Sequence, residues 1–331
     1  MTTLVTGASG FLGGRLTEML VEQGEDVTVL ARPTSDLRHL AHLPIRVVPG
    51  ELTDTQSLRE AVQNARRIFH CAACSTDWAP WKTYFDANVT GTENLLEAAR
   101  HAPELERFVH VSTTDVYGYP TVPYDESHPT RDAGLPYNQT KRLGELAVWK
   151  AHEDHGLPVT IVRPATIYGP RGKDFTVEVA TLLRQRLMAT IDSGRAPGGF
   201  AYVDNVAEAM LQASTHPDTV GQAYNLADGT GATWAEYLAL FAKALGCKPP
   251  WINLSFAAAT RLARVFETPH RLLGLSGRPL LTCHAVQLLG IDQEFPTEKA
   301  RGTFGFAPKV SLAEGIARSG AWLRDSGKIK A

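Results

Sequence analysis

Short apolar runs alternate with segments of helical periodicity through most of the chain. The apolar runs predict seven strands, over residues 2–5, 27–31, 45–48, 68–72, 107–112, 159–163 and 223–226. Apolar residues recurring every three to four positions predict helices over 10–23, 58–63, 88–100, 137–153, 177–186, 203–214 and 234–245. This alternation is typical of an α/β fold, a doubly wound parallel sheet with right-handed crossovers. A smaller, mostly helical lobe is expected at the C-terminal end.

Composition and charge narrow the class of protein. The 331 residues are 44% hydrophobic and 21% charged, which is ordinary for a globular protein of about two domains. Lys plus Arg number 33 and Asp plus Glu 35, so there is no basic excess for nucleic acid. The four scattered cysteines favour a reducing compartment, and we expect a cytoplasmic protein.

The best candidate for membrane contact is residues 251–266. Arg261 and Arg264 interrupt this segment, and no run in the chain approaches the ~20 apolar residues of a membrane span. The segment is therefore predicted to be an amphipathic helix packed on the protein surface.

A glycine-rich turn stands between the first predicted strand and the first predicted helix. Its glycines are Gly7, Gly10 and Gly13, at a spacing of three and three. A strand, such a turn and a helix in this order bind the pyrophosphate of a dinucleotide on the N–H groups of the helix N-terminus. The sequence thus predicts a dinucleotide-binding Rossmann domain over 1–170, which segments near 200–227 rejoin, and a substrate-binding lobe over 171–331.

The end of the second predicted strand bears on which dinucleotide binds. An acidic residue there would bind both ribose hydroxyls of NAD, but the strand ends Leu30-Ala31-Arg32. The guanidinium of Arg32 can pair with a 2′-phosphate, which favours NADP(H) over NAD(H).

Several ordered motifs resemble the extended short-chain dehydrogenase/reductase family. They are Thr6-Gly7-Ala8-Ser9-Gly10-Phe11-Leu12-Gly13, His70-Cys71-Ala72-Ala73, Asn88-Val89-Thr90-Gly91-Thr92, Val116-Tyr117-Gly118, Tyr137-Asn138-Gln139-Thr140-Lys141, Arg163-Pro164 with Tyr168-Gly169-Pro170, and Tyr202-Val203-Asp204-Asn205-Val206. The resemblance covers most of the chain. It implies a nicotinamide-dependent reaction at a carbinol or carbonyl, with the cofactor on the first half and the substrate on the second.

Tyr137 and Lys141 are the expected acid–base residues. They lie four residues apart and so share one face of a helix. Hydride transfer to a ketone needs a proton donor, and an ammonium group beside a phenol would lower its pKa from about 10 toward neutrality. By the resemblance, Thr113 binds the substrate oxygen; Ser112 is the near alternative, because a slip of one residue exchanges the two.

The resemblance also assigns the remaining binding residues. Those implied for the cofactor, besides Tyr137 and Lys141, are Gly7, Ser9, Gly10, Phe11, Leu12, Gly13, Arg32, Glu51, Leu52, Ala72, Ala73, Asn88, Ser112, Pro164, Thr166 and Ile167. Those implied for the substrate are Thr113, Thr114, Asp115, Tyr168 and Arg171. A helix N-cap would explain Asn88 equally well.

Other chemistry is less favoured by the sequence. Cys71 and Cys74 have the spacing of a redox pair but lack its usual context, so we interpret them as packing thiols. No further cysteine or histidine cluster has ligand spacing, and no metal site is expected.

The choice among the family's reactions depends on residues outside the shared motifs. Dehydratases of the family carry an Asp-Glu pair where this chain has Thr114 and Asp115, so dehydration is disfavoured. Pro279-Leu280-Leu281-Thr282 and 295–315 resemble the 3β-hydroxysteroid dehydrogenase branch, and residues 31–35 resemble dihydroflavonol-reductase-like members. These features predict an oxidoreductase for a lipophilic or polycyclic small molecule, with a pocket to which Trp251, Phe256, Leu262 and Phe266 could contribute.

Two alternative functions and the oligomeric state remain open at this point. A nucleotide-sugar epimerase with retained cofactor would need basic residues for a diphosphate, for which Arg171, Arg184, Arg186 and Arg195 are candidates. A non-catalytic nucleotide sensor is the alternative of another class. A homodimer formed through the helix of Tyr137 and its neighbour is expected by the resemblance.

Overall fold

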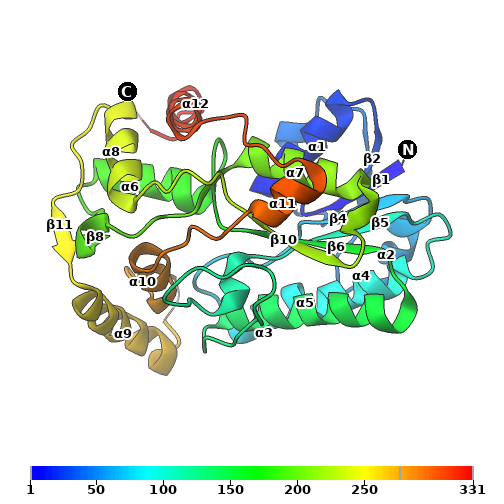
Figure 1. The fold of residues 1–331 in the computed structure, drawn as a ribbon, viewed down its shortest axis with the longest axis horizontal. Coiled ribbons are helices and arrows are strands. Elements are labelled where there is room, and N and C mark those ends of the chain that lie inside the picture. The colour runs from blue at the N-terminus through cyan, green and yellow to red at the C-terminus, as the bar shows by residue number, and fades with distance from the viewer. Residues whose placement is uncertain (1, 276, 330–331) are drawn as a thin grey trace.

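Seven parallel strands form the central sheet of the computed structural model, which describes residues 2–275 and 277–329 (Figure 1). They are β1 (Thr2–Thr6), β2 (Asp26–Ala31), β3 (Ile45–Pro49), β4 (Arg67–His70), β5 (Arg107–Val111), β6 (Val159–Pro164) and β10 (Gln222–Leu226). Their order is β10-β6-β5-β4-β1-β2-β3. The chain direction across the sheet reverses between β1 and β4, and ligands of doubly wound folds bind at that point. The predicted fold class is confirmed.

Helices cover both faces of this sheet. Along α1 (Phe11–Glu22), the buried Leu12, Leu16 and Leu20 repeat every four residues and pack with α7 (Val203–Thr215) on one face. The other face carries α2 (Thr55–Val62), α4 (Gly91–Ala99) and α5 (Pro136–His155), which enclose a separate apolar core. Figure 1 shows the sheet between these two helical layers.

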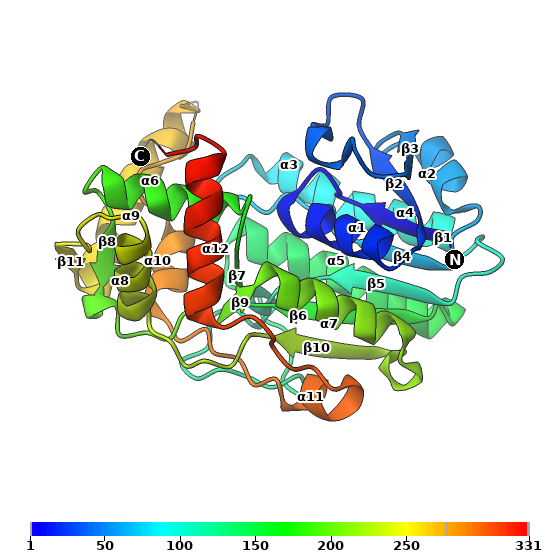
Figure 2. The ribbon, with the colours of Figure 1, turned by 90° about the horizontal axis from the view of Figure 1, so that it is seen from above.

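A second lobe stands beyond the carboxyl ends of the strands (Figure 2). Its helices are α6 (Val179–Arg184), α8 (Trp234–Ala244), α9 (Phe256–Leu273) and α10 (Cys283–Gly290), and α12 (Leu312–Asp325) packs on α8. Two small parallel sheets join β8 (Ala189–Ile191) to β11 (Ile252–Leu254) and β7 (Thr166–Tyr168) to β9 (Phe200–Tyr202). The remaining helices are α3 (Trp81–Phe85), before α4, and α11 (Glu298–Phe304), beside β10.

The predicted helix over 251–266 was wrong at its beginning. Ile252–Leu254 instead form β11, and the helix begins at Phe256 after Ser255, whose hydroxyl accepts a hydrogen bond from the N–H of Ala258. The N-cap serine fixes this start, because it satisfies an N–H group of the first turn that has no partner within the helix.

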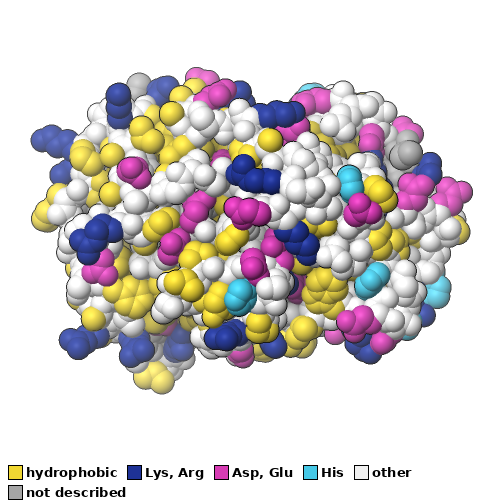
Figure 3. All heavy atoms as spheres, viewed as in Figure 1, with side chains coloured by type: hydrophobic (Ala, Val, Ile, Leu, Met, Phe, Trp, Pro, Cys, Tyr) yellow, Lys and Arg dark blue, Asp and Glu magenta, His cyan; other side chains and the backbone are white. Residues whose placement is uncertain are grey.

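Basic and acidic side chains are mixed on the face of the molecule in Figure 3, and neither sign of charge dominates there. In the described part of the chain, no helix combines the length and apolar character needed to cross a bilayer.

Candidate active site

A cavity of about 1050 Å³ lies between the sheet and the second lobe. Most of the site residues predicted from the sequence line it, namely Gly7, Ser9, Gly10, Phe11, Leu12, Gly13, Arg32, Glu51, Leu52, Ala72, Ala73, Ser112, Thr113, Thr114, Asp115, Tyr137, Lys141, Pro164, Thr166 and Ile167. The parallel strands end here, so residues distant in sequence meet at one edge of the sheet. The structure therefore gathers these candidates around one space.

The glycine turn is shaped for close approach by a ligand. Gly7 has φ +76°, and a Cβ there would lie 2.6 Å from the backbone nitrogen of Ala72. A Cβ on Gly13 would lie 2.4 Å from the carbonyl oxygen of Gly7. Gly10, the N-cap of α1, offers no side chain to the first-turn N–H groups, which are left to bind an anion. The turn thus fits the pyrophosphate of a nicotinamide dinucleotide.

The loop after β4 is held against this turn by Asn88, which does not line the cavity. Asn88 is buried; its side-chain oxygen accepts from the N–H of Cys74 at 2.8 Å, and its amide donates to the Cys74 carbonyl at 3.1 Å. The same amide donates to Thr140 on α5 at 3.1 Å. Asn88 is therefore no N-cap here, because it lies inside a helical segment, and it positions the wall of the cavity from behind.

Tyr137 and Lys141 project from the first turns of α5 into the cavity. The Lys141 ammonium donates to the carbonyl of Val111 at 2.6 Å, and burial lowers the pKa of Lys141 to about 8. Burial and the nearby Asp115 carboxylate raise the pKa of Tyr137, while a hydrogen bond with Thr113 opposes the shift. The direction of this shift is opposite to the one expected from the sequence, and the acid–base role of Tyr137 stays a prediction.

Ser112 and Thr113 have different partners. The hydroxyl of Ser112 donates to Glu145 at 2.6 Å, and Glu145 pairs with Arg163 on β6 in the core. The hydroxyl of Thr113 accepts from the N–H of Asp115 at 3.2 Å and lines the cavity. Since the Ser112 hydroxyl is used by a buried carboxylate, the geometry favours Thr113 for a substrate oxygen.

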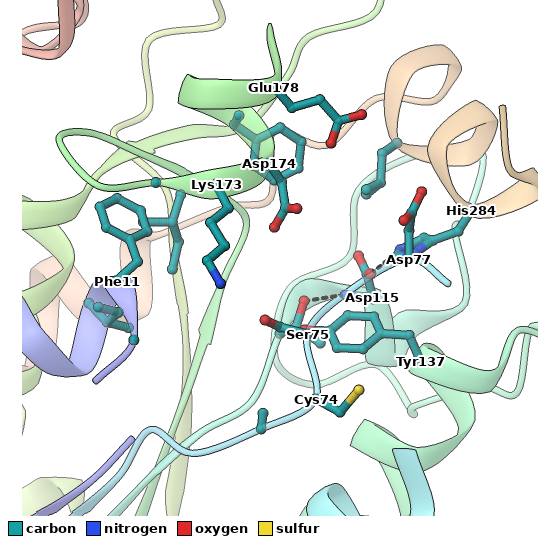
Figure 4. A pocket seen from close by; sticks show the side chains of 18 of the residues that line it. Phe11, Cys74, Ser75, Asp77, Asp115, Tyr137, Lys173, Asp174, Glu178 and His284 are labelled. Carbon is teal, nitrogen blue, oxygen red and sulfur yellow. Dashed lines mark hydrogen bonds and ion pairs between the residues drawn. The ribbon is translucent and has the colours of Figure 1, made fainter. Parts of the chain in front are cut away.

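Asp115 meets a histidine that the sequence did not single out. His284, near the start of α10, approaches the Asp115 carboxylate with its Nε2 atom at 2.9 Å (Figure 4). The His284 ring lies 5.4 Å from that of Tyr137, centroid to centroid. Both members of the pair are more than nine-tenths buried. No local motif marks His284, because 169 residues separate it from Asp115.

Tyr168 and Arg171 do not line the cavity, which corrects their assignment to the substrate. Tyr168 is fully buried among Phe200, Tyr202 and Tyr237. Arg171 forms two hydrogen bonds with Glu18 on α1, at 2.6 and 3.0 Å. Tyr168 therefore packs inside the second lobe, and Arg171 joins that lobe to α1.

The far wall of the cavity combines a charged cluster with apolar side chains. Arg278 pairs with Asp77 at 2.6 Å and with Glu178, and it joins the loop after β4 to the second lobe. Burial, with Glu178 and Asp77 nearby, raises the pKa of Asp174 to about 6. Lys173 projects from the same segment (Figure 4). The apolar lining comes from α6, α9, α10 and the segment before α10, with Val179, Leu182, Leu262, Phe266, Leu281, Leu288 and Leu289.

Of the four apolar residues offered by the sequence, Leu262 and Phe266 line the cavity, and Trp251 and Phe256 do not. Trp251 is mostly exposed and donates to the carbonyl of Arg186.

The cysteines beside the turn carry unreactive thiols. Burial raises the pKa of Cys71 to about 12 and also raises the pKa of Cys74. A thiol with so high a pKa is a poor nucleophile, which agrees with a packing role. Among the described residues, no group of three or more His, Cys, Asp or Glu side chains is placed to hold a metal.

Comparison with known proteins defines the class. The profile of the NAD dependent epimerase/dehydratase family matches residues 3–227. The chain is 33% identical over 321 residues to the 4-hydroxy-2-methyl-3-oxo-4-farnesyl-3,4-dihydroquinoline-1-oxide ketoreductase of Stigmatella aurantiaca, covering 96% of this chain and 95% of that one. It is 32% identical to a 2-alkyl-3-oxoalkanoate reductase of Stenotrophomonas maltophilia, covering 96% and 98%. The solved structure of gox2253 superposes with a TM-score of 0.83 at 30% identity, covering 99% of each chain.

The chain therefore belongs to the NAD dependent epimerase/dehydratase family, within the extended short-chain dehydrogenases/reductases. It is an enzyme of the nicotinamide-dependent kind that acts at hydroxyl and keto groups.

Proposed function

We propose that this enzyme is an NADP(H)-preferring oxidoreductase that interconverts a ketone and a hydroxyl group on a lipophilic or polycyclic small molecule. The observation that carries the proposal is a single cavity in which Tyr137, Lys141 and Thr113 lie between the glycine turn and an apolar wall. The names of the relatives agree with it, since one relative is a ketoreductase for a farnesylated quinoline oxide and the other a 3-oxoalkanoate reductase.

In the reducing direction, the bound nicotinamide would supply hydride to the carbonyl carbon. The protein must hold the carbonyl oxygen and protonate it as negative charge develops there. Thr113 donates a hydrogen bond to that oxygen, and Tyr137 transfers its proton to it. The phenol of Tyr137 carries the proton that this direction needs, because a tyrosine is protonated at neutral pH whether or not its pKa is raised. Lys141 holds positive charge beside the same space, anchored through Val111.

The apolar wall and the charges opposite it support a lipophilic substrate without a diphosphate. The described basic residues on the substrate side of the cavity are Lys173 and Arg278, and Arg278 is paired with two carboxylates. None of Arg171, Arg184, Arg186 and Arg195 is among the lining residues. A nucleotide-sugar epimerase would bury two phosphate charges there with Lys173 as their main counter-charge, at a cost in free energy. The geometry thus disfavours that alternative.

Arg32 supports the preference for NADP(H). It ends β2 and lines the cavity beyond the glycine turn, together with Ser35. A planar guanidinium there can bind a 2′-phosphate with two parallel hydrogen bonds.

The test is turnover of reduced nicotinamide, followed by its absorbance, with NADPH and NADH in parallel against cyclic and long-chain ketones. We expect ketone-dependent oxidation of NADPH. Replacing Tyr137 by Phe should lower kcat by about 10²–10⁴-fold and leave NADPH affinity unchanged, because only the proton donor is lost. Arg32→Ala should weaken NADPH binding more than NADH binding.

Four outcomes would contradict the proposal. Full activity of Tyr137→Phe would remove the assigned donor, and equal losses for both cofactors in Arg32→Ala would remove the NADP(H) preference. Conversion of a nucleotide sugar with no net cofactor change would establish the epimerase. Binding of NADPH with no turnover on any substrate would favour the nucleotide sensor.

A homodimer through α5 and α4 is part of the proposal. Leu146 on α5 is 41% exposed, which offers an apolar contact on this helix. Light scattering should give twice the chain mass of 36.0 kDa, and a monomer at all concentrations would refute it.

A further inference from the structure

Asp115 and His284 form a buried pair whose chemistry the proposed reaction leaves unused. Asp115 follows Thr113 by two residues in the short helical segment after β5, and His284 occupies the first turns of α10. Their relative exposures are 5% and 6%, and both line the cavity. Burying two ionisable groups costs free energy unless their opposite charges compensate each other.

The contact fixes how His284 carries its protons. An ionised carboxylate can only accept hydrogen bonds, so the Nε2 atom at 2.9 Å from Asp115 bears a hydrogen. The other ring nitrogen, Nδ1, is buried and has no hydrogen-bond partner among the described residues. A buried unpaired nitrogen costs free energy, which indicates that it acts when a proton or a ligand arrives.

Tyr119 also lies beside this pair. Its hydroxyl is buried next to the Asp115 carboxylate, and its ring centroid lies 6.1 Å from that of His284. Tyr119 has φ +57°, a conformation that aromatic residues rarely adopt. Such strain is retained where the surrounding structure enforces it, often at functional sites. Tyr119 also lines a second cavity, together with residues of α9 and α10.

The charge of the pair acts on Tyr137. The ionisable groups around the pair are Tyr119 beside Asp115, Tyr137 on α5 and Tyr84 on α3. Asp77, which is paired with Arg278, accepts a hydrogen bond from Thr282 before α10, and Glu267 on α9 accepts one from the N–H of Cys283. Asp174 acts on Tyr137 from the second lobe. With a neutral imidazole, the Asp115 carboxylate opposes ionisation of Tyr137. With an imidazolium, the pair is neutral overall, and the phenolate left by proton transfer is no longer repelled.

We propose that His284 returns a proton to Tyr137 after each reduction and that Asp115 orients the imidazole and stabilises its charged form. This inference rests on the proposed function. The Tyr137 O–H bond breaks as the substrate oxygen gains its proton. The Nδ1–H bond of the His284 imidazolium then breaks and the phenol re-forms through a bridging water, while the hydrogen on Nε2 stays with Asp115. The Nδ1 atom regains its proton from solvent water. One solvent proton is consumed per turnover, as reduction of a ketone requires.

His284 acts through Tyr137 and is a positioning residue. The measurements must therefore distinguish a loss of proton return from a loss of folding. His284→Gln keeps an N–H donor for Asp115 but does not titrate. We expect kcat for reduction to fall about tenfold or more, while kcat/KM changes little, because proton return follows the chemical step. In the wild type kcat should decline as pH rises through the titration of His284, and this limb should vanish in His284→Gln. His284→Ala should regain kcat when imidazole is added.

Two measurements on the protein alone keep the test independent of turnover. Nitrogen NMR should show the imidazole of the wild type with its hydrogen on Nε2, and Asp115→Asn should lower its protonation midpoint by about one pH unit. Ultraviolet titration should show Tyr137 ionising at a different pH in His284→Gln, with Tyr137→Phe identifying its signal. His270→Gln is the matched control, since His270 lies on α9 against Trp78 and outside the pair.

An unchanged pH limb in His284→Gln, or equal losses in kcat and kcat/KM without imidazole rescue, would overturn the inference. So would an NMR titration that Asp115→Asn leaves unmoved, which does not depend on the variants of His284 folding. If Tyr137→Phe retains full activity, the proposed function itself fails. If Tyr137→Phe is inactive and His284→Gln behaves as the wild type, only the role of the pair fails.

Discussion

Two adjacent hydroxyl groups at the end of β5 show how a single residue gains its role from its partner. Both residues line the cavity, but the hydroxyl of Ser112 donates to the buried Glu145, whereas that of Thr113 accepts from the N–H of Asp115. The sequence could not separate them, because a slip of one residue exchanges them in the motif. Their burial is similar, at 4% and 8% exposure, so the hydrogen-bond partner of each hydroxyl is what differs.

This difference predicts opposite phenotypes for the two removals. Thr113→Val should lower kcat by about 10²-fold, the loss seen when one oxyanion donor is removed, with little change in stability. Ser112→Ala should lower the free energy of unfolding by about 1–3 kcal/mol and change kcat only modestly. Steady-state kinetics and urea unfolding of both variants check this. A large loss of kcat in Ser112→Ala with little change in Thr113→Val would show that Ser112 contacts the substrate.

At the scale of elements, α5 is fixed by a buried ion pair between Glu145 and Arg163. Glu145 lies one turn after Lys141 on α5 and accepts hydrogen bonds from Ser112 and from Arg163 on β6. Arg163 also donates to the hydroxyl of Tyr117 at 2.7 Å, and Tyr117 donates to Asn225 on β10 at 2.9 Å. The Tyr117 of the Val-Tyr-Gly motif is thus a structural anchor that ties three elements together beneath the site.

Breaking this pair should be far more harmful than replacing it. Glu145→Ala leaves the Arg163 guanidinium buried without its carboxylate, and we expect a loss of about 3–5 kcal/mol in the free energy of unfolding. The double variant Glu145→Leu, Arg163→Met buries no charge and should lose much less. Urea unfolding measures both. An equal loss in the two variants would show that packing, not the charge, is what stabilises this region.

The elements that the sequence predicted well are those with a strong local pattern. All seven sheet strands and α1, α5 and α8 were found within about two residues of their predicted ends. Most of the strands are buried and therefore form short apolar runs, and the helices carry apolar residues at helical spacing. The short strands β7, β8, β9 and β11 were missed. Each has three residues and exists through its partner from another part of the chain, which no local periodicity reports.

Residues of the site were likewise predicted where they belong to a local motif and missed where they come from distant segments. The glycine turn, Tyr137 and Lys141 are contiguous motifs, and the sequence placed them around one ligand. His284, Asp77 and Arg278 reach the cavity from distant segments, so only the tertiary structure brings them together. Tyr168 and Arg171 show the reverse case, since their motif lies next to the site while their side chains serve the core and a pair with Glu18.

At the scale of the whole molecule, two neutral histidines lie at the centre of the sheet. His70 on β4 and His110 on β5 are register partners, each 1% exposed, with ring centroids 5.4 Å apart. His70 contacts the hydroxyls of Thr6 and Thr92, whereas neither nitrogen of His110 has a described partner. Burial, with the charge of Lys141 nearby, lowers the pKa of His70 to about 3 and also lowers that of His110.

These shifts predict how the fold responds to acid. An unfolded histidine gains its proton near pH 6.5, but His70 in the folded protein stays neutral down to about pH 3. The unfolded state therefore binds more protons in this window, and stability falls as the pH decreases from about 6.5, by up to ~1.4 kcal/mol per pH unit for each histidine. Urea unfolding between pH 7 and pH 4 measures the slope.

His110→Leu tests the origin of that slope, because it removes one titrating group from the core without removing a hydrogen bond. We expect the variant to unfold at a similar urea concentration at neutral pH. Below about pH 6.5 its free energy of unfolding should fall less steeply than that of the wild type, by up to ~1.4 kcal/mol per pH unit, the contribution of one proton. His42→Leu is the control, since His42 is exposed and should leave the slope as in the wild type. If His110→Leu and the wild type show the same slope, the acid sensitivity arises from the carboxylates, and the buried histidines contribute nothing to it.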